Sequence, residues 1–199
     1  MIQHFTYSRV SRLRTGIITA VLASLTGLTV AGCSNLDTSN TTKAAMQSIT
    51  KADVLAAQKA WGDGIVAIGD VYQAKGDYAS RASQHIKDLY AYGQSEVLFK
   101  PTLAADVQFR ETFGGALSYF VGGEIAEDKG FAIKPWSKVR FGEQQIITDA
   151  DSAVAMGNYY FTPVGSTEET KVEFTFGYMR DADGNLRINV HHSALPYSG

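Results

Sequence analysis

The chain contains 199 residues, with 18 lysines and arginines against 20 aspartates and glutamates, and a net charge of −2 at pH 7. That length suits one domain with an extension, and a hydrophobic content of 45% is enough to fill a core, which excludes global disorder. The charge gives no electrostatic footprint for nucleic acid. The single cysteine, Cys33, excludes an internal disulfide, a CxxC redox site and a cysteine-based zinc site.

Residues 1–32 predict a signal peptide. Three arginines precede an uncharged stretch at 16–31, and no acidic residue occurs before Asp37. A helix of this stretch would span about 24 Å, short of the roughly 30 Å hydrocarbon core of a bilayer, which favours a signal peptide over a transmembrane anchor. It ends in Val30-Ala31-Gly32-Cys33, which resembles a bacterial lipobox.

The lipobox implies cleavage before Cys33 and lipidation of this residue; an ordinary secretory signal is the alternative. Several acyl chains on one residue attach a protein stably to a membrane. Ser34 follows the cysteine, which in a two-membrane bacterium resembles the signal for transfer to the outer membrane. We therefore expect a lipid-anchored protein on the periplasmic side, with residues 33–49, rich in Ser, Thr and Asn, as a flexible tether.

Residues 50–199 are expected to form a single domain that begins with two helices. Apolar residues at helical spacing predict a helix at 51–75, and Thr50 with Asp53 resembles a capping box. Three glycines within it each weaken a helix by about 1 kcal/mol relative to alanine, unless they permit close packing. The second helix is predicted at 78–92 and carries His85 on its apolar stripe.

The remainder of the domain predicts a sheet. A short strand at 96–102 contains Pro101, and residues 107–121 are either a third helix or irregular because of their glycine pairs. Alternating apolar and polar residues predict strands at 138–148, 153–162, 170–180 and 186–194, with a hairpin turn at 181–185. Helices followed by strands indicate an α+β fold with the helices on one face of a curved antiparallel sheet.

The last strand carries the most informative polar residues. Alternation places Arg187, Asn189, His191 and Ser193 on one face and Leu186, Ile188, Val190 and His192 on the other. His191 and Ser193 can therefore serve one site, and a solvated polar face is the alternative. Because His191 and His192 point in opposite directions, a three-histidine zinc site with His85 is disfavoured, and His85 is expected to pack beneath the sheet.

Three segments together resemble the iota-class carbonic anhydrases, which are similar to SnoaL-like proteins and to the association domain of calcium/calmodulin-dependent kinase II. The segments are Val97-Leu-Phe-Lys-Pro-Thr102, Gly115-Ala-Leu-Ser-Tyr-Phe-Val-Gly-Gly123 and Val190-His-His-Ser193. The resemblance covers about residues 51–198. It implies a cone-shaped, nuclear-transport-factor-2-like fold, a homodimer, and reversible hydration of CO2 to bicarbonate.

By this resemblance, Thr102, Tyr119 and Ser193 would offer hydroxyl groups to bicarbonate, with His191 beside them as a candidate proton acceptor. The family implies catalysis without a metal, although some relatives are associated with manganese or zinc. Trp61 or Phe120 would help to form an apolar wall. Where the family often shows a second serine after His-His-Ser, this chain has Ala194.

Two other functions remain open at this stage. One is a non-catalytic, dimeric binding or assembly module of the same fold. The other is an isomerase or dehydratase, which would use a buried Asp or Glu as its base. The acidic residues near the motifs, Asp106, Glu111 and Glu124, are expected to be peripheral.

Overall fold

The computed structural model describes residues 47–199. The predicted signal peptide, Cys33 and most of the predicted tether lie outside this range. Within the described range, no helix combines the length and the hydropathy that a membrane crossing requires.

Helix α1 (Lys51–Gln73) begins at the predicted capping box. The backbone N–H of Asp53 donates to the Thr50 hydroxyl at 3.2 Å, and the Thr50 N–H donates to the Asp53 carboxylate at 2.9 Å. The glycines of this helix are sites of close approach. A Cβ at Gly64 would lie 2.1 Å from Nδ1 of His85, so the absence of a side chain there lets the imidazole pack against the helix.

The other helices are shorter. Asp77 is the N-cap of helix α2 (Tyr78–Leu89), and Thr112 is the N-cap of α3 (Phe113–Val121). The Thr112 hydroxyl accepts a hydrogen bond from the Gly115 N–H at 3.1 Å. The segment 107–121, left open between helix and loop, therefore divides at Thr112. A 3-10 turn, η1 (Phe131–Ile133), precedes the sheet.

The sheet has the strand order β1-β5-β4-β3-β2. The long strands are β2 (Trp136–Thr148), β3 (Ser152–Pro163), β4 (Thr170–Arg180) and β5 (Leu186–Ala194), and they pair antiparallel. The short β1 (Leu98–Lys100) instead pairs parallel with β5, so the sheet is mixed rather than antiparallel throughout. The reason lies upstream, where the chain leaving α2 already runs alongside β5 through the parallel bridge between Tyr90 and Ile188.

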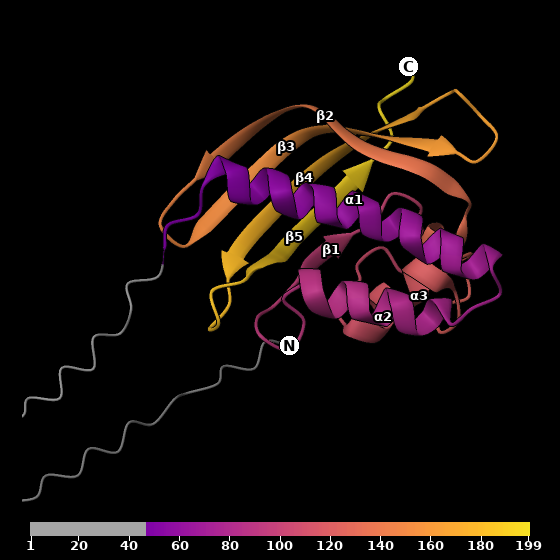
Figure 1. Ribbon diagram of the computed structural model, residues 1–199, viewed down its shortest axis with the longest axis horizontal. Coiled ribbons are helices and arrows are strands. Elements are labelled where there is room, and N and C mark those ends of the chain that lie inside the picture. The colour runs from indigo at the N-terminus through magenta and orange to yellow at the C-terminus, as the bar shows by residue number, and fades with distance from the viewer. Residues whose placement is uncertain (1–46) are drawn as a thin grey trace, which may run out of the picture. The chain divides into compact units, whose positions relative to one another are not determined.

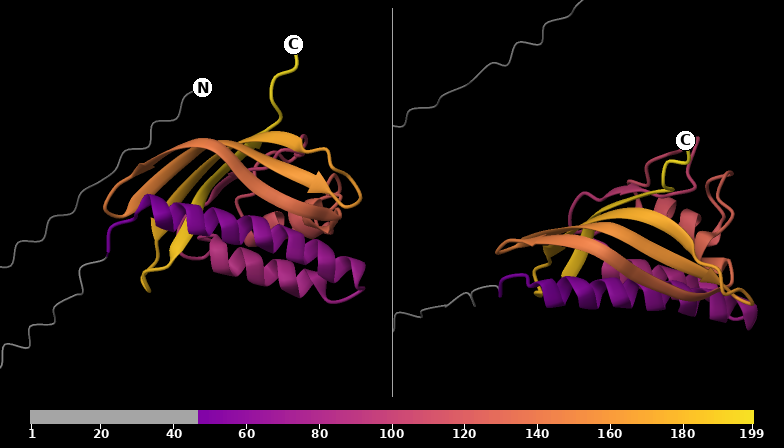
Figure 2. Two further views of the ribbon diagram at one scale, coloured as in Figure 1. Left: turned by 45° about the horizontal axis from the view of Figure 1, so that its top comes forward. Right: turned by 90° about the horizontal axis from the view of Figure 1, so that it is seen from above.

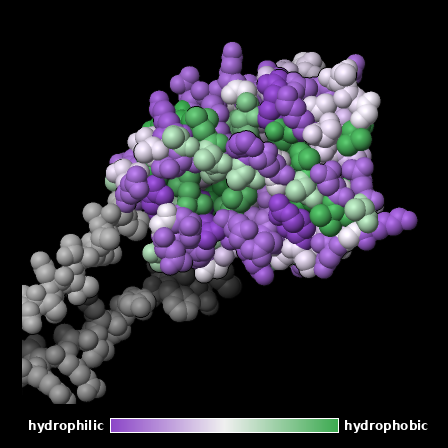
Figure 3. All heavy atoms as spheres, in the orientation of Figure 1, coloured by the Kyte–Doolittle hydropathy of each residue, from purple (hydrophilic) through white to green (hydrophobic). Residues whose placement is uncertain are grey.

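The strands curve over the helices, as Figures 1 and 2 show, with α1 crossing beneath β2–β5 and α2 lying beside α1. The core lies between this concave face and the helices and is rich in aromatic residues. On the face drawn in Figure 3, hydrophobic residues lie in small groups between hydrophilic ones. The α+β prediction with segregated helices is confirmed.

A bulge interrupts the pairing of β4 with β5. Gly177 pairs with Val190 and Tyr178 pairs with Ile188, which leaves Asn189 without a partner in the ladder. A bulge of one residue reverses the face on which the preceding side chains lie. Ile188 is therefore buried, on the core side of the strand.

The bulge corrects the alternation predicted for the last strand. His191 and Ser193 share the buried face, and His192 is exposed on the other, as predicted. Arg187 and Asn189 do not belong with His191 in the core. The Arg187 guanidinium instead donates to the Asp181 carboxylate at 2.7 Å, at the hairpin turn.

Candidate active site

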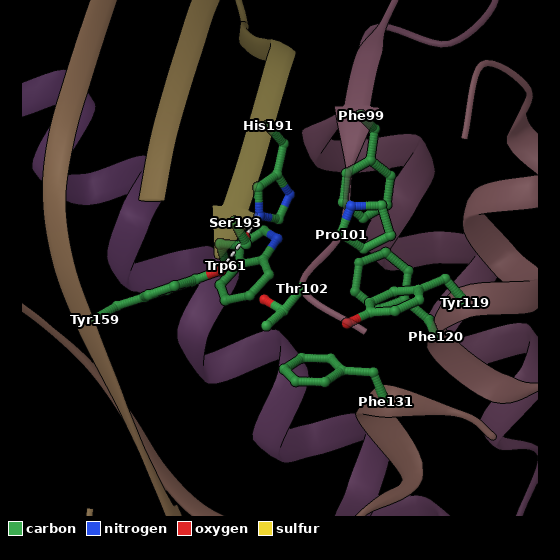
Figure 4. A pocket seen from close by; sticks show the side chains of 10 residues that line it. All are labelled: Trp61, Phe99, Pro101, Thr102, Tyr119, Phe120, Phe131, Tyr159, His191 and Ser193. Carbon is green, nitrogen blue, oxygen red and sulfur yellow. Dashed lines mark hydrogen bonds between the residues drawn. The ribbon is translucent and has the colours of Figure 1, made fainter. Parts of the chain in front are cut away.

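A small cavity lies between the concave face of the sheet and α3, and ten residues line it (Figure 4). They are Trp61, Phe99, Pro101, Thr102, Tyr119, Phe120, Phe131, Tyr159, His191 and Ser193. The space open to the centre of a water molecule is about 10 Å³, close to the room that one water needs. The walls are mainly aromatic, and the polar groups are hydroxyls and one imidazole.

The four residues predicted as catalytic meet at this cavity from three elements. Thr102 follows β1, Tyr119 comes from α3, and His191 and Ser193 come from β5. In Figure 4 the hydroxyl groups of Thr102 and Tyr119 point toward the centre of the group. The predicted wall residues Trp61 and Phe120 also line the cavity.

His191 is enclosed by aromatic rings. Its ring stacks on Phe99 with centroids 4.6 Å apart, and it meets Phe176 at 4.2 Å and Trp61 at 5.5 Å. Phe99 and Phe176 are its ladder partners on β1 and β4, so the sheet register itself fixes this stack. Burial in these surroundings lowers the pKa of His191 well below its usual value, and His192 and His85 lower it further. The imidazole is therefore neutral at pH 7.

Both nitrogens of His191 are in hydrogen bonds. Nδ1 lies 2.7 Å from the Tyr90 hydroxyl, and Nε2 lies 2.9 Å from the Ser193 hydroxyl. Tyr90 also accepts a hydrogen bond from the Trp61 indole at 2.9 Å, and Ser193 is hydrogen-bonded to the Tyr159 hydroxyl. The result is a continuous hydrogen-bonded chain whose two ends, Trp61 and Tyr159, both line the cavity, with the buried Tyr90 between Trp61 and His191.

The tyrosines of the site keep their protons. Burial raises the pKa of both Tyr119 and Tyr159 above the usual tyrosine range. No carboxylate lines the cavity. The hydroxyl groups can therefore donate hydrogen bonds to an anion without repulsion from a neighbouring negative charge.

The loop that carries Thr102 is fixed from below by Glu127. Its carboxylate accepts hydrogen bonds from the backbone N–H groups of Ala105, Asp106 and Val107 at 2.8–3.0 Å. These bonds lower the pKa of Glu127 to about 2. The buried guanidinium of Arg110 lies 3.4 Å from the same carboxylate and 2.8 Å from Asp128. The loop is thus held as one wall of the cavity.

Sequence reasoning missed Tyr90 and Tyr159 as members of the site. The signal for Tyr159 was its alternation with Phe161, because alternate residues of a strand share a face and both of these are buried. Tyr90 is the C-cap of α2, and no local pattern marks it, because its partners lie 29 and 101 residues away.

The remaining candidates lie outside the cavity. His85 packs in the core against Phe120 and Trp61, as expected, and burial, with a further contribution from Arg81, lowers its pKa to about 3. Asp106, Glu111 and Glu124 are exposed and do not line the cavity. Ala194 neighbours Ser193 but lies on the opposite side of the strand.

No group of three His, Cys, Asp or Glu side chains within residues 47–199 is placed to hold a metal ion. The polar groups of the cavity itself are hydroxyls and a single imidazole that is already hydrogen-bonded through both nitrogens. Such a donor set suits hydrogen bonding to a small oxyanion.

Comparison with known proteins links this geometry to a family. Residues 52–195 match the family model described as metal-independent carbonic anhydrase. A metal-independent carbonic anhydrase from Nostoc sp. strain PCC 7120 is 46% identical over 156 residues, which are 76% of each chain.

Solved structures agree with the fold. The crystal structure of the iota-carbonic anhydrase from a cyanobacterium, complexed with bicarbonate, matches with a TM-score of 0.73 and 43% identity, over 76% of this chain and 95% of that chain. An NTF2-like protein of unknown function from Pseudomonas putida KT2440 matches with a TM-score of 0.51 and 13% identity, over 74% and 87% of the two chains. The second likeness confirms the NTF2-like fold alone.

Proposed function

Because this chain belongs to the metal-independent carbonic anhydrase family, we propose that it catalyses the reversible hydration of CO2 to bicarbonate and a proton in the cavity between β5 and α3. The observation that carries the proposal is the convergence of Thr102, Tyr119 and Ser193 with His191 on one small, mainly aromatic cavity. The expectation of a metal-independent enzyme is confirmed by the family that the chain matches.

The cavity suits both sides of the reaction. The aromatic walls accommodate apolar CO2 and limit the entry of bulk water. The protonated hydroxyls of Thr102, Tyr119 and Ser193 donate hydrogen bonds to the oxygens of bicarbonate. Because the space admits only about one water, we propose that the Thr102 loop moves outward slightly when substrate enters.

In the forward direction, the oxygen of a bound water forms a bond to the carbon of CO2. Negative charge develops on the CO2 oxygens, and the hydroxyl donors stabilise it as an oxyanion hole does. One O–H bond of the attacking water breaks, and we propose that its proton passes to buffer in the solvent. Each donor in such an arrangement contributes about 10²–10³ to the turnover rate.

His191 contacts the substrate region through Ser193. The sequence led us to expect that its imidazole takes the proton directly from water. In the structure, however, Tyr90 and Ser193 occupy its two nitrogens. We therefore propose that His191 supports Ser193 and does not itself take the proton from water.

Stopped-flow CO2 hydration tests the proposal with the chain that follows the predicted signal, residues 34–199, after exhaustive chelation and with the metal content verified. Activity should persist, and Tyr119→Phe, Thr102→Val and Ser193→Ala should each lower kcat by about 10²–10³. Tyr160→Phe is the matched control, because Tyr160 stacks with Arg140 away from the cavity. Full activity in Tyr119→Phe would refute the hydroxyl mechanism.

Two other outcomes of this experiment have defined meanings. Activity that disappears on chelation and returns with one metal would keep the reaction but overturn the proposed site chemistry. A chain without activity in either state, but with saturable binding of bicarbonate, would favour the non-catalytic binding module.

We also propose that the chain forms a homodimer through the outer face of the sheet. Leu98, Phe109 and Met156 are 64%, 62% and 60% exposed there. Two shallow hollows beside them share His192. Sedimentation velocity should show a dimer for residues 34–199 and a monomer for Met156→Lys, and a monomeric wild-type chain would contradict the proposal.

Finally, we propose that Cys33 anchors the domain to the bacterial envelope as a lipidated amino terminus. The uncharged stretch at 16–31 and the Val30-Ala31-Gly32-Cys33 sequence support it. In a two-membrane host, the wild-type chain should fractionate with outer membranes and the Cys33→Ser variant should not. Intact-mass measurement should show the acyl chains on the wild type, and an unmodified Cys33 would contradict the proposal.

A further inference from the structure

The hydrogen-bonded chain behind the cavity determines which atoms face the substrate. Tyr90 is 1% exposed and is the one member of this chain that does not line the cavity. Its hydroxyl oxygen is 2.9 Å from Nε1 of Trp61 and 2.7 Å from Nδ1 of His191. These are its hydrogen-bond partners among residues 47–199.

The direction of each bond follows from the number of hydrogens. An indole N–H can only donate, so Tyr90 accepts from Trp61. The single hydrogen of the Tyr90 hydroxyl then has one remaining acceptor, Nδ1 of His191, and this nitrogen must be unprotonated to accept it. A neutral imidazole carries one hydrogen, which is therefore on Nε2 and is donated to the Ser193 hydroxyl.

The reverse tautomer leaves a buried group unsatisfied. If Nδ1 carried the hydrogen, Tyr90 would accept from both Trp61 and His191, and its own hydrogen would have no acceptor among the described residues. A buried donor without a partner bears the full cost of its lost hydration. Burial raises the pKa of Tyr90 well above the usual range, so the hydroxyl keeps its hydrogen, and in the reverse tautomer this hydrogen would lack an acceptor.

The tautomer decides what the cavity end of the chain offers. The five members from Trp61 to Tyr159 carry five hydrogens and make four links. With Nε2 protonated, one hydroxyl hydrogen of the Ser193–Tyr159 pair is left over and is free to face the substrate. With Nδ1 protonated, the hydrogens would point inward, and the same pair would present only lone pairs.

We propose that Tyr90, held by Trp61, is a positioning residue that fixes His191 as a donor to Ser193 and thereby leaves a hydroxyl hydrogen free for the substrate oxygen. The inference rests on the proposed function of the cavity. It assigns to the histidine the role of a fixed donor in the resting enzyme. It also extends the site to a residue that does not touch the substrate.

Nitrogen NMR of the 15N-histidine-labelled chain, residues 34–199, tests the assignment directly. At pH 7 the wild-type His191 should show a protonated Nε2 and an unprotonated Nδ1, identified by loss of its signals in His191→Gln. This measurement does not depend on activity, so it separates failure of the inference from failure of the proposed function. A protonated Nδ1 in the wild type would overturn the inference.

Variants connect the tautomer to substrate binding. Tyr90→Phe should give a mixture of tautomers, and equal populations would weaken bicarbonate affinity and kcat/KM by about twofold, or more if the Nδ1–H form predominates. Tyr92→Phe is the matched control, because Tyr92 stacks on Tyr90 at 5.9 Å but donates to the Arg110 carbonyl. It should leave the His191 signals and affinity unchanged. An unchanged tautomer in a folded Tyr90→Phe would also refute the inference.

Discussion

Acid should destabilise the domain through its two buried histidines before its carboxylates titrate. His85 and His191 are each 2% exposed. Burial, aided by Arg81, lowers the pKa of His85 to about 3, and burial lowers that of His191 well below 6.5. In the unfolded chain both titrate near 6.5. Between these values the unfolded state binds more protons, so the free energy of unfolding falls as pH falls.

The expected magnitude follows from this difference in proton binding. Between pH 7.5 and pH 5, each histidine that stays neutral in the fold costs about 2 kcal/mol of stability, and the pair costs about 4 kcal/mol. Most unfolded carboxylates titrate below this window. Urea denaturation of residues 34–199 at half-unit steps of pH measures the change.

Single substitutions separate the contributions. His85→Gln should remove about half of the acid-dependent loss, whatever its effect on stability at pH 7.5. His192→Gln is the control, because His192 is exposed to water in the fold and its replacement should leave the slope unchanged. An unaltered slope in His85→Gln would refute the reasoning, because the imidazole would then have to be charged in the fold.

Two further predictions concern the supports of the site. Glu127→Gln should loosen the Thr102 loop, and the Ala105 amide should then exchange its hydrogen faster than in the wild type at pH 7. This difference should disappear as pH falls from about 4.5 toward 2, because Glu127 of the wild type becomes protonated there. Equal exchange rates at pH 7 would contradict the prediction. Gly64→Ala should lower the melting temperature, because the added Cβ would meet the His85 ring. Overpacking of this kind typically costs about 1–3 kcal/mol, which exceeds the gain from the higher helix propensity of alanine. A higher melting temperature would count against the prediction.

Local patterns predicted the elements well because each one uses a simple period. The strand at 170–180 and the strand at 186–194 have the predicted bounds, since alternation and the turn at 181–185 define both ends. The first helix ends two residues earlier than predicted. The parallel pairing of β1 could not be predicted, because it depends on where the chain emerges from α2 rather than on the composition of the strand.

The site was predicted in part, for a related reason. The residues of three short motifs converge as the resemblance implied, and Thr102, Tyr119, His191 and Ser193 share one cavity. The supporting residues were not predicted. Tyr90 reaches His191 across 101 positions of sequence, and only the assembled fold brings the two together. The face predicted for Arg187 was wrong, because a single-residue bulge cannot be recognised from the alternation of apolar and polar residues.

That bulge limits how the gene for such a chain can vary in length. Deleting Asn189 would make Ile188 and Val190 neighbours opposite Tyr178 and Gly177, which gives a regular ladder in which His191 and Ser193 keep the core face. One lost codon at Asn189 would therefore keep the cavity residues on the core face, whereas one lost codon at His192 would make His191 and Ser193 adjacent and place their side chains on opposite faces. A lost codon in the turn at 181–185 would instead break the hydrogen bonds that the buried Asp181 carboxylate accepts from the backbone N–H groups of Asp183 and Asn185.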